Sequence, residues 1–323
     1  MVQGVVIEQG CIVDVNPATG AVIERVPVTT KEQLDAAVAA ARAAQMGWAA
    51  VSLPERTELV KEAVTRIGID RAGLARSITM EMGKILKEAE EEVDDNANKD
   101  EYCDLVRAAN EPEIHGSSVI VRHPHGVVSI CSPWNFPVEE IVLLSIPALI
   151  AGNAIVVKPS EVVPLSSGAV VRCLMEAFES THPGLVHLVQ GDGAVGAALV
   201  NHPGVDMCAM TGSTATGAKI LQCASSSLKP VVVPVLGHQP RTAGRGPLLA
   251  SLSWGPVLAS LSSLLSLTSL RVRLPRWEAR VWGQGSDGRV CGCRPRRRRK
   301  GRCRLFSHER WAGVLRRGAS LCR

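Results

Sequence analysis

Aromatic side chains are scarce in this sequence. Its 323 residues include one Tyr and three Phe, and aromatic residues make up only 3% of the chain. Hydrophobic residues still account for 46%, so the chain can bury a sizeable core. Aliphatic side chains must therefore fill most of that core. The length fits one large domain or two domains of ordinary size.

The sequence also lacks a disulfide framework. Six of its ten Cys are scattered singly over the first 223 residues, and the other four lie beyond residue 290. Such spacing in a chain of this length is typical of a reducing compartment. The first ten residues lack a basic segment followed by an apolar run, so we expect no secretory signal. These absences favour a cytoplasmic protein.

Acidic residues are nearly absent from the C-terminal part. Residues 236–323 hold 19 Lys and Arg against 3 Asp and Glu, whereas residues 1–235 hold 17 basic and 28 acidic residues. Neither helical nor strand periodicity persists beyond Val233. We therefore predict a folded domain over residues 1–235. Residues 236–323 are expected to form a basic, low-complexity tail that is either disordered or foreign to this domain.

Three features of the tail indicate other functions. The basic run Arg296–Lys300 could bind nucleic acid. The uncharged stretch Pro247–Leu270 is long enough to span a bilayer, but it contains seven Ser and two Pro. The Cys and His residues of the tail do not have the spacing of a standard zinc finger. We expect no nucleic-acid partner, membrane span or metal, and we keep nucleic-acid binding through the tail as an alternative function.

The N-terminal third has the pattern of two strands followed by helices. Residues 14–28 predict a strand, a turn at Asn16–Gly20 and a second strand. Thr30 is a candidate N-cap for one helix, and Pro54 is expected to open another. Residues 81–107 predict an acidic helical stretch. Its charge run is typical of a solvated face.

From Val119 onward, short β-branched runs alternate with helical patterns. Such alternation predicts an α/β fold with a mostly parallel sheet and helices on both faces. The expected strands are 127–131, 154–158, 186–189, 205–210 and 229–233. The expected helices are 139–151, 166–180, 194–201 and 213–226. Ligands of such sheets bind beyond the carboxyl ends of the strands.

Three polar blocks follow predicted strands, namely Pro133–Pro137, Lys158–Glu161 and Thr211–Gly217. Two prolines make the first block rigid, so Asn135 can present its amide as a fixed donor. The carboxylate of Glu161 can accept hydrogen bonds from sugar hydroxyls. The third block opens a helix whose N-terminus favours phosphate. Each block alone also fits a plain structural role: a tight turn, a surface Lys–Glu pair or a helix cap.

Taken in this order, the three blocks resemble the aldehyde dehydrogenase superfamily, from about Val13 to Val233. The resemblance implies a Rossmann-like domain that binds NAD, with NADP as the alternative. It makes Asn135 the donor that holds the oxyanion formed from an aldehyde. The acidic side chain of Glu161 indicates a weak preference for NAD over NADP, because a carboxylate disfavours a 2′-phosphate. The cofactor-binding residues that it implies are Pro133, Trp134, Lys158, Ser160, Glu161, Gly191, Gly196, Thr211, Gly212, Ser213 and Gly217.

Residues 113–128 resemble the family's β-hairpin, which pairs subunits. The resemblance therefore implies a homo-oligomer joined through this hairpin. The family reaction oxidises an aldehyde to a carboxylic acid.

The family's nucleophile and base have no match in this sequence. The family carries Glu-Leu-Gly-Gly after the last strand, whereas Pro234 stands here about where that Glu belongs. The family's Gly-Gln-x-Cys has only a partial echo at Gly283–Ser286, which ends in Ser. Cys131 lies in an apolar strand, and we interpret it as a core residue. We therefore expect this chain to lack the catalytic domain and to be inactive alone, and a non-catalytic NAD-binding fragment is the second alternative.

Overall fold

A five-stranded parallel sheet forms the centre of the domain. The computed structural model describes residues 5–233 and 268–273, all within one compact unit. Every neighbouring pair of the central sheet is parallel, in the order β10-β9-β6-β7-β8. Its strands are β6 (Val127–Cys131), β7 (Ala154–Lys158), β8 (Val186–Leu188), β9 (Met207–Met210) and β10 (Val231–Val232). The predicted α/β class is confirmed.

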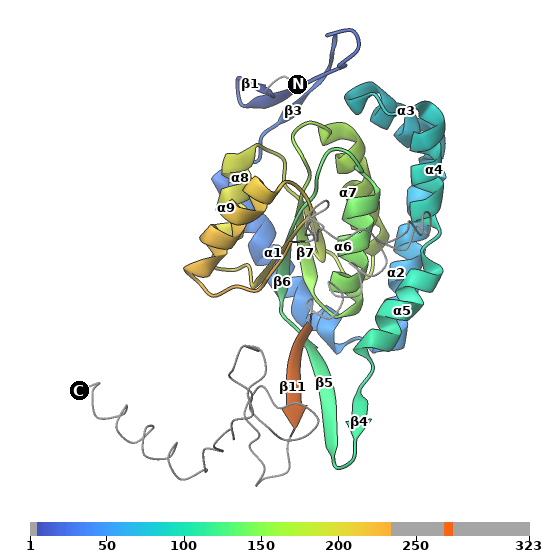
Figure 1. The fold of residues 1–323 in the computed structure, drawn as a ribbon, viewed down its shortest axis with the longest axis vertical. Helices are drawn as coiled ribbons and strands as arrows, with labels where there is room; N and C mark the ends of the chain where they lie inside the picture. Colours follow the sequence, from blue (N-terminus) through green and yellow to red (C-terminus); the bar gives the residue numbers. More distant parts are fainter. Residues whose placement is uncertain (1–4, 234–267, 274–323) are drawn as a thin grey trace, which may run out of the picture. The chain divides into compact units, whose positions relative to one another are not determined.

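Helices cover both faces of this sheet (Figure 1). On one face lie α6 (Glu139–Ile150) and α7 (Pro164–Phe178), and on the other lie α1 (Lys31–Ala50), α8 (Gly193–Asn201) and α9 (Thr214–Ser225). Because both faces are covered, β7 and β9 are buried throughout. Among the described residues, no helix is both long and apolar enough to cross a membrane.

The strand order reverses direction at β6. From β6 the chain adds β7 and then β8 on one side, and it returns to place β9 and β10 on the other side. The connections after β6 and β9 therefore leave the sheet on opposite faces. The carboxyl ends of β6 and β9 border a crevice, which is where ligands bind in open α/β sheets.

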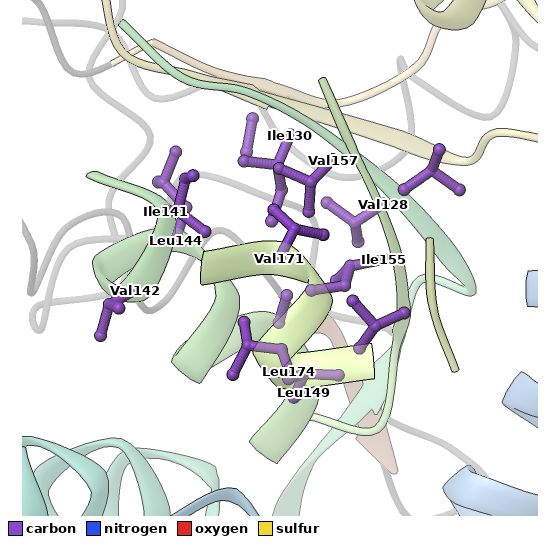
Figure 2. Packing of buried hydrophobic residues seen from close by; sticks show 14 of the residues in the cluster. Val128, Ile130, Ile141, Val142, Leu144, Leu149, Ile155, Val157, Val171 and Leu174 are labelled. Atoms are coloured by element: carbon purple, nitrogen blue, oxygen red, sulfur yellow. The ribbon is translucent and has the colours of Figure 1, made fainter. Parts of the chain in front are cut away.

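Aliphatic side chains fill the core, as the composition predicts. Figure 2 shows Val128, Ile130, Ile155 and Val157 of the sheet facing residues of α6 and α7. Alternate residues of β6 and β7 point to this face because side chains alternate along a strand. Two aromatic rings meet in the core, those of Trp48 and Phe178, whose centroids lie 5.4 Å apart.

The N-terminal elements follow the predicted pattern. A three-stranded sheet consists of β1 (Val6–Glu8), β2 (Cys11–Val15) and β3 (Val22–Pro27). The Asn16 side chain holds the turn by accepting from the backbone N–H of Ala18 at 2.9 Å. Thr30 caps α1 in a capping box with Gln33. The helical layer then continues through α2 (Leu53–Thr65), the 3₁₀ helix η1 (Arg66–Asp70), α3 (Arg71–Met82), α4 (Leu86–Ala97) and α5 (Asp100–Asn110).

The acidic stretch 81–107 differs from its prediction in two ways. It is divided among three helices, because Gly83 takes the left-handed conformation at φ 79° and ends α3. The solvated-face interpretation is also wrong for two of its carboxylates. Glu81 and Glu92 are buried, and both accept hydrogen bonds from backbone N–H groups.

The predicted hairpin is present as β4 (Glu113–His115) and β5 (Ser118–Pro124). A third strand, β11 (Thr268–Arg273), pairs with β5 in antiparallel fashion (Figure 1). The expectation of disorder is therefore wrong for these six residues. Without β11, β5 would be an edge strand of the hairpin, with unpaired backbone groups open to an extended segment. The basic run and most of the serine-rich stretch lie outside the described residues.

Two buried carboxyl groups meet where the N-terminal sheet contacts the helices. Glu81 accepts hydrogen bonds from the backbone N–H of Leu165 at 2.6 Å and of Ser166 at 2.8 Å. Burial raises the pKa of Glu81 to about 7, and it raises the pKa of the neighbouring Asp14 to about 6. Burial, and the repulsion that Asp14 exerts on Glu81, both favour a proton on this pair.

The stability that this carboxyl pair contributes should therefore fall as the pH rises from about 4 to about 7. The folded pKa values of Glu81 and Asp14 are raised, so their contribution is complete below the unfolded pKa values and is lost through the folded ones. Between pH 4.5 and 7.5 the free energy of unfolding should fall less in Glu81→Gln than in the parent, by on the order of 1–3 kcal/mol. Urea denaturation at several pH values measures this free energy, with exposed Glu88→Gln as the control. A variant with the parent's pH dependence would contradict this account.

Candidate functional site

A groove of about 790 Å³ lies at the carboxyl ends of β6, β7 and β9, where the strand order reverses. It brings together residues from all three polar blocks of the sequence. The residues that line it from these blocks are Pro133, Trp134, Asn135, Lys158, Ser160, Glu161, Thr211, Gly212, Ser213 and Thr216. Segments up to 80 residues apart in sequence thus share one site, because parallel strands end at the same edge of a sheet.

The Asn135 amide is not used to hold its own turn. Asn135 is half-buried and lines the groove. Its side chain makes no hydrogen bond to any residue that the structure describes. The simple turn role predicts such a bond. The amide therefore remains available to a ligand in the groove.

The turn that carries Asn135 is anchored from α4 instead. Glu92 accepts from the backbone N–H groups of Val138 at 2.9 Å and Glu139 at 3.2 Å, at the start of α6. Its carboxylate also pairs with Lys84. The Lys84 ammonium lies 4.2 Å from the centroid of the Phe136 ring, a cation–π distance. These contacts fix both the turn and the following helix.

Lys158 is buried, which the surface-pair interpretation does not predict. Only 7% of its side chain is exposed, and its ammonium lies 3.2 Å from the carboxylate of Glu161. The same ammonium donates to the carbonyl of Pro159 at 2.9 Å. Gly196 makes room for this side chain, because a Cβ at position 196 would lie 3.3 Å from Lys158 Cδ.

The N-terminus of α9 faces the groove. Ser213 is its N-cap and accepts from the backbone N–H of Thr216 at 3.1 Å. No acidic residue lies in the first turn. The unpaired N–H groups and the helix dipole there favour a negatively charged group such as phosphate.

Cys131 lies at the end of β6 and lines the groove, although it is only partly exposed. Burial raises the pKa of its thiol to about 11. A nucleophilic cysteine needs a lowered pKa, because the thiolate is the reactive form. The geometry therefore gives Cys131 no activated sulfur.

Two of the glycines proposed from the sequence do not line the groove. A Cβ on Gly191 would lie 2.3 Å from Val195 Cγ2, and one on Gly217 would lie 2.9 Å from Val233 Cγ1. Both positions are closed by neighbouring side chains of the protein. The structure thus gives these glycines a role in close packing.

The helical walls of the groove were not predicted from the sequence. They share a spacing of three, four and seven residues along α8 and α9, which places them on one face of each helix. These residues are Gly193, Ala197 and Val200 on α8, and Lys219, Ile220 and Cys223 on α9, beside Thr216 of the third block. Spacing alone could have found them once Gly196 and Ser213 were proposed. Ser132 and Met210 complete the lining.

Comparison with known proteins agrees with this geometry. The family model described as "Aldehyde dehydrogenase family" matches residues 6–242. The chain belongs to the aldehyde dehydrogenase family. The match covers the whole groove, and it confirms the resemblance first seen in the three blocks.

Curated relatives support the same assignment. The chain is 38% identical over 240 residues to the 3,6-anhydro-alpha-L-galactose dehydrogenase of Streptomyces coelicolor, covering 72% of this chain and 48% of that protein. It is 34% identical over 232 residues to the D-glyceraldehyde dehydrogenase (NADP(+)) of Thermoplasma acidophilum, covering 70% and 47%. The chain therefore spans about half the length of the curated relatives it matches.

Solved aldehyde dehydrogenases share the fold. A betaine aldehyde dehydrogenase of Staphylococcus aureus in complex with NAD+ has a TM-score of 0.64 and 31% identity, covering 68% of this chain and 45% of that one. A mutant of aldehyde dehydrogenase C from Pseudomonas syringae, in complex with NAD+ and octanal, has a TM-score of 0.65 and 34% identity, covering 72% and 48%.

Proposed function

We propose that the groove binds a nicotinamide dinucleotide and that the chain is the nucleotide-binding part of an aldehyde dehydrogenase. The observation that carries this proposal is the placement of the α9 N-terminus at the point where the strand order reverses. A dinucleotide needs a phosphate site beside a sugar site. The groove offers the first at Ser213 and the second at the paired Lys158 and Glu161.

Each group of the groove has a chemical task in this proposal. The backbone N–H groups at the start of α9 hold the pyrophosphate. Glu161 accepts from ribose hydroxyls, while Lys158 fixes the position of its carboxylate. Asn135 presents its unused amide to the groove as the donor for the oxyanion of the family reaction, although this chain supplies no nucleophile to form that oxyanion. Bound NAD+ supplies the hydride acceptor.

Turnover needs two more groups that the sequence does not supply. The family's general base has Pro234 about in its place, and Pro has no group that takes a proton. The family's nucleophilic Cys has no counterpart, and burial raises the pKa of the groove's own Cys131 thiol. The family reaction converts an aldehyde to a carboxylic acid. We infer that this chain binds the dinucleotide without completing that reaction.

Calorimetry and an activity assay test this proposal together. We expect NAD+ to bind with a micromolar Kd, which corresponds to about 8 kcal/mol. Addition of an aldehyde should produce no NADH above background. Absence of binding to the folded chain would refute the nucleotide site. Turnover that Asn135→Ala abolishes would refute the inferred inactivity.

We place the domain boundary near residue 235, close to the end of the family match at residue 242. Assembly into a homo-oligomer would use the hairpin, where β4 is an edge strand of the described sheet and Ile114 is 77% exposed. A cytoplasmic location is supported by the six cysteines of the described ranges, all of which are free thiols.

A further inference from the structure

Charge in the groove is unbalanced. Of the described residues that line it, three carry a charge, namely Lys158, Glu161 and Lys219. The first two form an ion pair at 3.2 Å. Lys219 makes no ion pair or hydrogen bond with any residue in the described part of the chain. One positive charge therefore faces the groove without an anionic partner.

The ion pair with Lys158 changes how strongly Glu161 can repel a phosphate on a bound dinucleotide. A free carboxylate at this position would repel a 2′-phosphate on the adenosine ribose. Here the carboxylate lies beside the ammonium of Lys158, whose side chain is only 7% exposed. The ammonium therefore offsets part of the repulsion between this carboxylate and a nearby phosphate. The pair excludes a 2′-phosphate less strongly than a free carboxylate would.

Lys219 is placed for an anion other than the pyrophosphate. It lies in the second turn of α9, six residues beyond Ser213, which corresponds to about 9 Å along the helix axis. The pyrophosphate site is at the helix N-terminus. Besides the pyrophosphate, NADP+ carries a second anionic group, the 2′-phosphate, which NAD+ lacks. A lysine can bind such a phosphate as a point charge.

We propose that Lys219 binds the 2′-phosphate of NADP+ and so lets the groove accept both dinucleotides. This inference rests on the proposed nucleotide site. It replaces the preference for NAD that the sequence alone suggests through Glu161.

Calorimetric titration of the full chain with NAD+ and with NADP+ tests the role of Lys219. We expect the parent to bind the two dinucleotides with Kd values within about tenfold of each other. Lys219→Met should weaken NADP+ binding about tenfold, or about 1.4 kcal/mol, and should change NAD+ binding less than about twofold. Lys219→Arg should retain NADP+ binding. Lys87→Met is the matched control, because Lys87 is exposed on α4 and does not line the groove.

The outcomes separate the two proposals. Equal loss of both dinucleotides in Lys219→Met would overturn the inference, because it would place the lysine at the pyrophosphate. NAD+ binding without NADP+ binding in the parent would overturn it as well, and would leave the nucleotide site intact. If neither dinucleotide bound, the proposed nucleotide site itself would be refuted.

Discussion

Replacement of Glu92 by Ala is expected to lower the free energy of unfolding by about 3–5 kcal/mol. Glu92 is 7% exposed, and its carboxylate has three partners. Its loss leaves the Lys84 ammonium without its ion-pair partner, with only 10% of that side chain exposed. It also leaves the N–H groups of Val138 and Glu139 without their acceptor at the start of α6. An unpaired buried charge is among the most destabilising changes a single substitution can make.

Two variants of the same helix make this prediction specific. Glu91→Ala removes an exposed carboxylate that lies 3.7 Å from Lys87, and we expect a change of about 0–0.5 kcal/mol. Glu92→Gln keeps an acceptor for the backbone N–H groups but loses the charge, so its effect should lie between the two. Urea denaturation followed by circular dichroism measures all three. Equal effects of Glu91→Ala and Glu92→Ala would show that Glu92 behaves as a surface residue.

The central sheet could be predicted from the sequence because its rules are local. The limits predicted for β6 and β7 agree with the structure to the residue, since buried parallel strands appear as short β-branched runs. The Thr30 and Ser213 caps were also predictable, because a cap depends on a hydroxyl within three residues of its acceptor site. Three polar blocks after three strands then indicated the groove.

Residues that act over long sequence distances could not be predicted in this way. Glu92 was interpreted as part of a solvated acidic face, yet it binds the start of α6 46 residues away. Nothing in the local pattern distinguishes it from its exposed neighbours. Lys219 was missed for a similar reason, since a lysine on a helix is usually solvated. Gly191 and Gly217 were proposed from their place in the sequence pattern, but only the packing shows which glycines line the groove and which face neighbouring side chains.

Substitution of Gly196 by Leu should weaken NAD+ binding about 100-fold, or about 2.7 kcal/mol. A Cβ at this position would lie 3.3 Å from Lys158 Cδ and 3.6 Å from Cε. The rest of a leucine side chain must therefore displace the Lys158 stem or extend into the groove. Displacement would separate the ammonium from Glu161, and extension would fill the volume that the adenosine part needs.

The stability of this variant distinguishes a blocked groove from a damaged fold. Leu is a better helix former than Gly by up to about 1 kcal/mol, so unfolding free energy should not fall greatly if only Lys158 moves. Gly47→Leu is the matched control, because Gly47 also lies within a helix and a Cβ there would meet no atom within 4 Å. It should bind NAD+ as the parent does. If Gly196→Leu also bound NAD+ with the parent's affinity, the adenosine would have to lie away from α8, and the groove described here would not be the nucleotide site.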